Sequence, residues 1–197
     1  MYPGRLMSKK KPSPPRLTKA DVAKLLSDPS GSVRAKTSAK IAAQFESHQL
    51  SPTERKIAED IFRVLVKDAE VLVREALSAQ LKASADLPHD IALALARDVD
   101  SVALPMLKFS EVLTDEDLIQ IVRSCGPAKQ AAIAQRANIT ASVSDAVVET
   151  GNPAAVARLV RNETAALSEA ALDRVIAEYQ DAPGVSDSLA RRRDLPP

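Results

Sequence analysis

Few side chains in this sequence could take part in chemistry, and they do not combine into a catalytic or metal-binding pattern. The two histidines, His48 and His89, lie far apart, and the single cysteine, Cys125, has no second thiol with which to bind zinc. The sequence also lacks a glycine-rich phosphate loop and a dinucleotide-binding fingerprint. We therefore expect no enzyme activity, no catalytic residues, no cofactor and no metal site.

Each of the reactive groups has a simpler structural interpretation. His48 follows one predicted helix and His89 lies in the first turn of another, so both are expected on the surface. Cys125 precedes Gly126-Pro127, where its thiol could lie at a helix N-terminus and gain reactivity, but a small packed side chain is the preferred interpretation. The acidic run 115–117 could suggest carboxylate catalysis, yet negative charge at a helix start accounts for it.

Composition indicates an all-α protein without a membrane span. The 197 residues are 45% hydrophobic and 27% charged, as in ordinary globular chains, and only five are glycine. The net charge of +1 gives no overall preference for nucleic acid or membrane. No apolar run approaches the roughly 18 residues that a bilayer requires. A single cysteine and the lack of a signal peptide favour a cytoplasmic location.

The helices that would position any site are best seen in the stretch 86–107, DLPHDIALALARDVDSVALPML. Pro88 suits a first helical position, and Asp98-Val99-Asp100 favours a sharp corner before a second helix. Pro105 is tolerated because it lies near the first turn of that second helix. Such a helical pair cannot bury both of its apolar faces alone, so we expect it to stack on similar pairs.

The rest of the chain is predicted to contain similar pairs of helices. Ser51-Pro52-Thr53-Glu54 is the clearest helix start, with serine at the N-cap, proline at the first position and glutamate at the third. Residues 1–17 are rich in basic residues and proline, and we expect a disordered basic arm there. The remainder, 18–197, is predicted to contain six helical pairs: 18–28 and 30–46, 52–68 and 70–84, 88–98 and 100–110, 114–124 and 127–136, 140–150 and 152–161, 167–181 and 183–193.

The corners of the pairs recur along the chain. Asp28 and Asp68 both open the pattern D-x-x-x-x-V-R, and equivalent corners follow at intervals of roughly 26–40 residues. This pattern resembles HEAT repeats, and it predicts a right-handed α-solenoid, a HEAT-like superhelix of about six helical hairpins. Asp194-Leu195-Pro196 repeats the helix start Asp86-Leu87-Pro88. We therefore expect the domain to be truncated at its C-terminal end.

A closer resemblance rests on five blocks of sequence: LPHDIALALARDVDSVALPML, VLTDEDLIQIVRS, AKQAAIAQR, VSDAVVETGN and LARRRDLPP. Together they resemble an uncharacterised, mainly alphaproteobacterial family of HEAT-like helical-repeat proteins, a domain of unknown function. The resemblance covers about residues 18–197 and implies a fold and a lineage. It implies no catalytic or binding residues.

Charge is divided between the two helices of each pair. Summed over the six pairs, the first helices carry −8 and the second helices +8. In a solenoid the second helices usually line the concave surface, so we expect a basic groove there. Its predicted partner-binding residues are Arg34, Lys40, Arg74, Lys129, Arg136, Arg158, Arg161, Arg191 and Arg192. The alternative is that these charges only solvate exposed helix faces and complement helix dipoles.

Three functions are compatible with these sequence features. A non-enzymatic scaffold would bind a protein or peptide partner along the concave surface. An acidic segment of the partner would suit the basic residues there. A nucleic-acid-binding protein would use the basic groove and the N-terminal arm, although only 3% of the residues are aromatic and could stack on bases. An enzyme of unrecognised type has no supporting motif. We favour the scaffold.

Overall fold

The computed structural model describes Leu25, residues 28–179, Asp181 and residues 185–191. The expected arm 1–17 and most of the expected helix 18–28 lie outside this part of the chain. Over the described residues the fold is all-helical and contains no strand. The helices are α2 (Gly31–Glu46), α3 (Pro52–Leu65), α4 (Val71–Leu81), α5 (His89–Ala96), α6 (Asp100–Phe109), α7 (Asp115–Ser124), α8 (Pro127–Ile133), α9 (Ala141–Glu149), α10 (Pro153–Arg161), α11 (Glu169–Tyr179) and α12 (Val185–Arg191).

The helices begin where the local sequence predicts. At α3 the Ser51 hydroxyl accepts from the Glu54 backbone N–H at 3.3 Å, and the Glu54 carboxylate accepts from the Ser51 backbone N–H at 2.9 Å. At α7, Thr114 and Asp117 form the same reciprocal pair. Helix α5 starts one residue later than expected, because Pro88 has extended backbone angles and lies at the N-cap.

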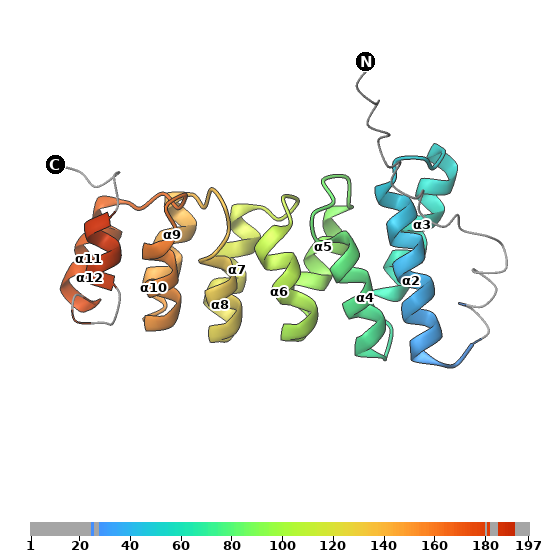
Figure 1. The fold of residues 1–197 in the computed structure, drawn as a ribbon, viewed down its shortest axis with the longest axis horizontal. Helices are drawn as coiled ribbons and strands as arrows, with labels where there is room; N and C mark the ends of the chain where they lie inside the picture. The colour runs from blue at the N-terminus through green and yellow to red at the C-terminus, as the bar shows by residue number, and fades with distance from the viewer. Residues whose placement is uncertain (1–24, 26–27, 180, 182–184, 192–197) are drawn as a thin grey trace, which may run out of the picture.

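The helical pairs stack in serial order. Second helices pack on second helices from α2 through α4, α6, α8 and α10 to α12, while α7, α9 and α11 pack on one another in the first-helix layer. Figure 1 shows the result as a row that runs from α2 and α3 at one end to α11 and α12 at the other. Each pair therefore contacts mainly the pair before it and the pair after it.

One continuous apolar core lies between the two layers. Fully buried side chains run along the array, from Phe45 and Phe62 through Leu107 to Leu159. The rings of Phe45 and Phe62 meet edge to face, with centroids 5.3 Å apart. Burying such a side chain contributes about 1.5–3 kcal/mol. The apolar faces of each helical pair are therefore buried against the neighbouring pairs, as the sequence pattern predicts.

None of the described helices combines the length and the apolarity that crossing a bilayer requires.

Candidate functional site

Two arginines of the D-x-x-x-x-V-R pattern clamp neighbouring pairs together at their corners. Arg34 donates from Nε and Nη2 to the Asp68 carboxylate at 2.8 and 2.9 Å, and from Nη1 to the Pro29 carbonyl at 2.7 Å. Arg74 repeats the arrangement one pair later, with Asp98 as its carboxylate and the Asp68 carbonyl as its backbone acceptor. The side chains in both pairs are at most 18% exposed. These arginines therefore join successive pairs instead of facing solvent.

Lys129 and Arg136 also form hydrogen bonds between helical pairs. Lys129 is 7% exposed, and its ammonium donates to the Asp98 carbonyl, which continues the row of corner contacts. Arg136 donates to the carbonyls of Leu107 and Ser110 at 2.7 Å each, so it caps the C-terminus of α6. Burial lowers the pKa of the Arg136 guanidinium below its ordinary value.

Four of the predicted partner-binding residues accordingly have contacts within the fold. The sequence predicts Arg34, Arg74, Lys129 and Arg136 as partner-binding residues, but the structure places their donors in contacts between helical pairs, so their part in partner binding stays a prediction. Lys40 is half-buried and has an interaction partner already. Arg192 lies outside the described residues.

Arginines of the first-helix layer are engaged as well. Arg63 of α3 pairs with Asp90 of α5 at 2.8 Å, and Arg123 of α7 pairs with Glu149 of α9 at 3.1 Å. Arg55, Arg97 and Arg174 also donate to described side chains or carbonyls. Among all arginines of the described part of the chain, only Arg158, Arg161 and Arg191 have no hydrogen bond, ion pair or ring contact with another residue.

These three side chains, which we call the arginine surface, lie on neighbouring second helices. Arg158 and Arg161 are three residues apart on α10, so they share its exposed face, while Leu159 and Val160 of the same helix are fully buried. Arg191 is exposed at the end of α12, which packs on α10. The amphipathic pattern of α10 thus decides that both of its arginines face solvent.

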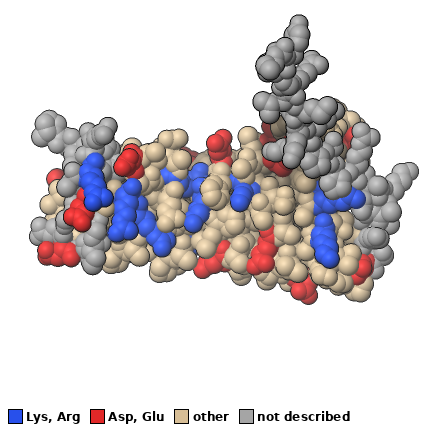
Figure 2. Space-filling model, viewed as in Figure 1, with Lys and Arg blue, Asp and Glu red and all other residues tan. Residues whose placement is uncertain are grey.

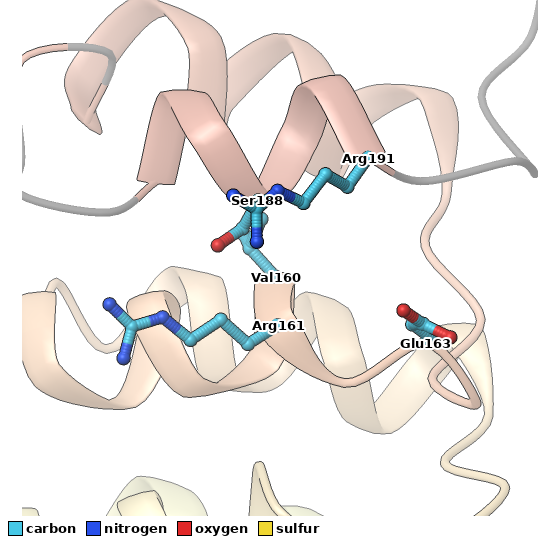
Figure 3. Close-up of a pocket in the computed structure, with 5 residues that line it drawn as sticks. All are labelled: Val160, Arg161, Glu163, Ser188 and Arg191. Carbon is cyan, nitrogen blue, oxygen red and sulfur yellow. The ribbon is translucent and has the colours of Figure 1, made fainter.

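Two adjacent cavities share Arg161. One, of about 330 Å³, is lined by Gln135, Arg158, Arg161 and Asn162, none of which is acidic. The other, of about 130 Å³, is lined by Val160, Arg161, Glu163, Ser188 and Arg191. Figure 3 shows that Arg161 and Arg191 extend toward the same side of this second cavity, whereas Glu163 lies on the opposite side. Both guanidinium groups therefore lie on the side of the cavity away from the Glu163 carboxylate.

Asn162 holds this part of the surface in place. Its amide N–H group donates to the carbonyls of Ala134 and Arg136 at 3.0 and 2.6 Å, at the C-terminal end of α8. Its amide oxygen accepts from the backbone N–H and the hydroxyl of Thr164. The end of α10 is therefore fixed against α8, and with it the position of Arg161. The sequence analysis missed Asn162, Gln135 and Ser188, because none of them carries charge.

Figure 2 shows where basic side chains gather on one face of the molecule. Lysine and arginine side chains collect over the C-terminal end of the array, with a second group over α2. On α2, Arg34 is paired with Asp68 and Lys40 already has a partner, which leaves the exposed Lys36. Near the C-terminal end, Arg158, Arg161 and Arg191 all have unused hydrogen-bond donors.

The two histidines and the cysteine have different surroundings in the described part of the chain. His48 is an exposed residue with a positive φ of 52°, as expected for a surface position. His89 is half exposed, but its Nε2 lies 2.6 Å from a carboxylate oxygen of Asp117, a link between α5 and α7 that the sequence did not predict. Burial raises the pKa of Asp117, and hydrogen bonds from His89 and Thr114 outweigh it, so the pKa lies below its ordinary value.

Cys125 is partly buried, in line with a packing role. Within the described ranges, no three histidine, cysteine, aspartate or glutamate side chains lie together as metal ligands would.

Comparison with known proteins identifies the C-terminal part of the chain only. Residues 102–197 match the model of a family described as "Uncharacterised protein conserved in bacteria (DUF2336)". The expected resemblance to an uncharacterised bacterial family is therefore confirmed over this region. No curated protein and no solved structure shows a significant match to the chain.

Proposed function

We propose that this chain is a non-enzymatic interaction module whose arginine surface binds an acidic segment of a protein partner. We further propose that the stacked pairs form a right-handed, HEAT-like α-solenoid, and that the module acts in the cytoplasm. The serial contacts of successive second helices support the solenoid. The single cysteine supports the location.

One observation carries the binding proposal. Eight arginines of the described chain donate to partners within the fold, and the three that do not, Arg158, Arg161 and Arg191, come together around two adjacent cavities. A guanidinium with five unused donors is suited to bidentate recognition of carboxylate or phosphate groups. Arginines scattered over the surface would be expected only to interact with solvent. The grouping of these three arginines on the second-helix layer favours a shared ligand.

The proposal is tested by reversing charge at Arg158 and Arg161. We expect the double variant R158E/R161E to bind a fluorescein-labelled glutamate-rich peptide at least about tenfold more weakly, as measured by fluorescence anisotropy. Its melting temperature should stay within about 2 °C of wild type, because exposed substitutions away from internal contacts change stability by about 0.5 kcal/mol or less.

A matched control makes the same change in net charge on the other layer. Lys56 and Lys67 are exposed on and just after α3, so K56E/K67E should leave peptide affinity within about twofold of wild type. A large fall in the melting temperature of R158E/R161E would show that these arginines are structural. A 20-base-pair DNA duplex that binds more tightly than the peptide at 150 mM salt would favour nucleic-acid binding instead.

A further inference from the structure

Among the described residues, the cavity at the ends of α8 and α10 is lined by two positively charged side chains and no negatively charged one. Its lining consists of Gln135, Arg158, Arg161 and Asn162, and its volume is about 330 Å³. The side-chain amide of Asn162 is already satisfied by the end of α8 and by Thr164, so it forms a fixed wall. The remaining donors that a ligand could use belong to the two guanidinium groups and to Gln135, which is exposed.

The two positive charges of this cavity exceed the single negative charge of one carboxylate. A carboxylate has about four acceptor sites on its two oxygens but only one negative charge, which a single guanidinium balances. A phosphomonoester carries a charge of about −1.5 to −2 near pH 7 and has three strongly accepting oxygens. Two guanidinium groups therefore match the charge of a phosphomonoester better than that of a glutamate side chain, and the third phosphate oxygen offers an acceptor for the Gln135 amide.

The neighbouring cavity supports a ligand that continues as a chain. It shares Arg161 with the first cavity, and it adds Arg191, the polar Ser188 and the carboxylate of Glu163. A lining with both signs of charge is suited to a peptide backbone and mixed side chains, and it is poorly suited to a run of phosphates. A single phosphate next to a polypeptide segment fits the two cavities better than a nucleic-acid backbone does.

We infer that the arginine surface recognises a phosphorylated serine or threonine in a protein segment, with the phosphate held by Arg158 and Arg161 and the adjoining residues placed near Arg191. This inference rests on the proposed function and narrows its ligand from an acidic segment to a phosphorylated one.

The test uses the full chain and three matched peptide pools. The pools have the same randomised flanking positions and differ only at a central residue, which is phosphoserine, glutamate or serine. Peptides retained by the immobilised chain are counted by mass spectrometry, and the best phosphopeptide is then compared with its glutamate and serine versions by anisotropy. We expect the phosphopeptide to bind at least about fivefold more tightly than the glutamate version and at least about tenfold more tightly than the serine version.

Two further measurements separate phosphate recognition from general charge. Affinity for the phosphopeptide should fall as the pH is lowered from 7 to 5, because its second ionisation has a pKa near 6, whereas the glutamate peptide keeps its charge in that range. Arg161→Lys should lose most of the preference for phosphate, because an ammonium keeps the charge without the fork. Arg123→Lys is the control, since Arg123 pairs with Glu149 in the other layer.

The outcomes distinguish this inference from the broader proposal. If the glutamate version binds as tightly as the phosphopeptide and both depend on Arg158 and Arg161, phosphate recognition is wrong and acidic-segment binding stands. If none of the three pools is retained, both are wrong. Equal binding of the phosphopeptide by wild type and R158Q/R161Q would also overturn the inference.

Discussion

The role of each arginine in this chain depends on whether a carboxylate or carbonyl of the next pair lies within its reach. Arg34 and Arg74 reach Asp68 and Asp98 with both arms of the guanidinium fork. Arg158 of α10, by contrast, faces solvent and has no described partner. Chemically identical side chains therefore stabilise the array at one end and remain available at the other.

Removing a corner arginine should destabilise the fold. We expect Arg74→Ala to lower the free energy of unfolding by about 2–3 kcal/mol, because Asp98 would keep a desolvated charge without its bidentate partner. Arg74→Lys should recover only part of this loss, since one ammonium cannot span both carboxylate oxygens. Urea denaturation gives both values. Arg158→Ala is the control and should change stability by about 0.5 kcal/mol or less.

The corner carboxylates also predict how stability depends on pH. Hydrogen bonds from Arg34, assisted by the Glu70 backbone N–H and opposed by burial, hold the pKa of Asp68 below its ordinary value. A carboxyl group whose pKa is lower in the folded state stabilises the fold above its unfolded pKa of about 3.9, and that contribution is lost as the pH falls through the folded pKa.

We therefore expect the stability difference between wild type and Asp68→Asn to stay constant from pH 7 to about pH 5 and to shrink below about pH 4. The measurement is the free energy of unfolding in urea at each pH. A difference that remained unchanged down to pH 2.5 would mean that the charge on Asp68 does not contribute.

Short helices make capping important for each pair. Most helices of the described chain have 7 to 11 residues, so a large share of their backbone groups lies at the ends. Helix α3 has a complete capping box with proline at its first position, and α10 begins with an Asn152 side chain that accepts from two backbone N–H groups. These local bonds specify where each helix begins before any packing occurs.

The α3 cap can be measured directly. We expect Ser51→Ala to lower the free energy of unfolding by about 1 kcal/mol, because the Glu54 backbone N–H loses its acceptor and the Glu54 carboxylate loses the Ser51 hydroxyl. In a double-mutant cycle with Glu54→Ala the two effects should not add, since the bonds are reciprocal. Strict additivity would show that the box acts as two independent contacts.

Serial stacking should make stability local along the array. Each pair contacts its neighbours, so a defect in one pair is transmitted mainly through the adjacent interfaces. We expect Leu159→Ala in α10 to reduce hydrogen-exchange protection in α9 to α12 by about 30-fold or more, as a loss of about 2 kcal/mol implies. Protection in α2 and α4 should change much less.

Leu77→Ala in α4 is the matched control, because Leu77 is also fully buried in a second helix. It should produce the opposite distribution, with the larger loss near α2 to α6. A uniform loss of protection in both variants would indicate that the array unfolds as one cooperative unit.

The sequence by itself determined the helices and their order. Ser51-Pro52-Thr53-Glu54 and Thr114-Asp115-Glu116-Asp117 carry their own start signals, and the corners at Asp68 and Asp98 separate paired helices. Such signals act over a few residues, so helix bounds could be predicted without tertiary information. The uncharacterised bacterial family could likewise be inferred from sequence blocks, and it is confirmed over residues 102–197.

Only the tertiary structure decided which basic side chains are available to a partner. Counting charge by helix treats Arg34, Arg74 and Arg158 alike, but the first two find carboxylates 34 and 24 residues away in the next pair. Asn162, which carries no charge, turned out to fix the end of α10. A hydrogen-bond partner in a neighbouring pair depends on the register with which the pairs stack, and this register arises from the packing of distant side chains.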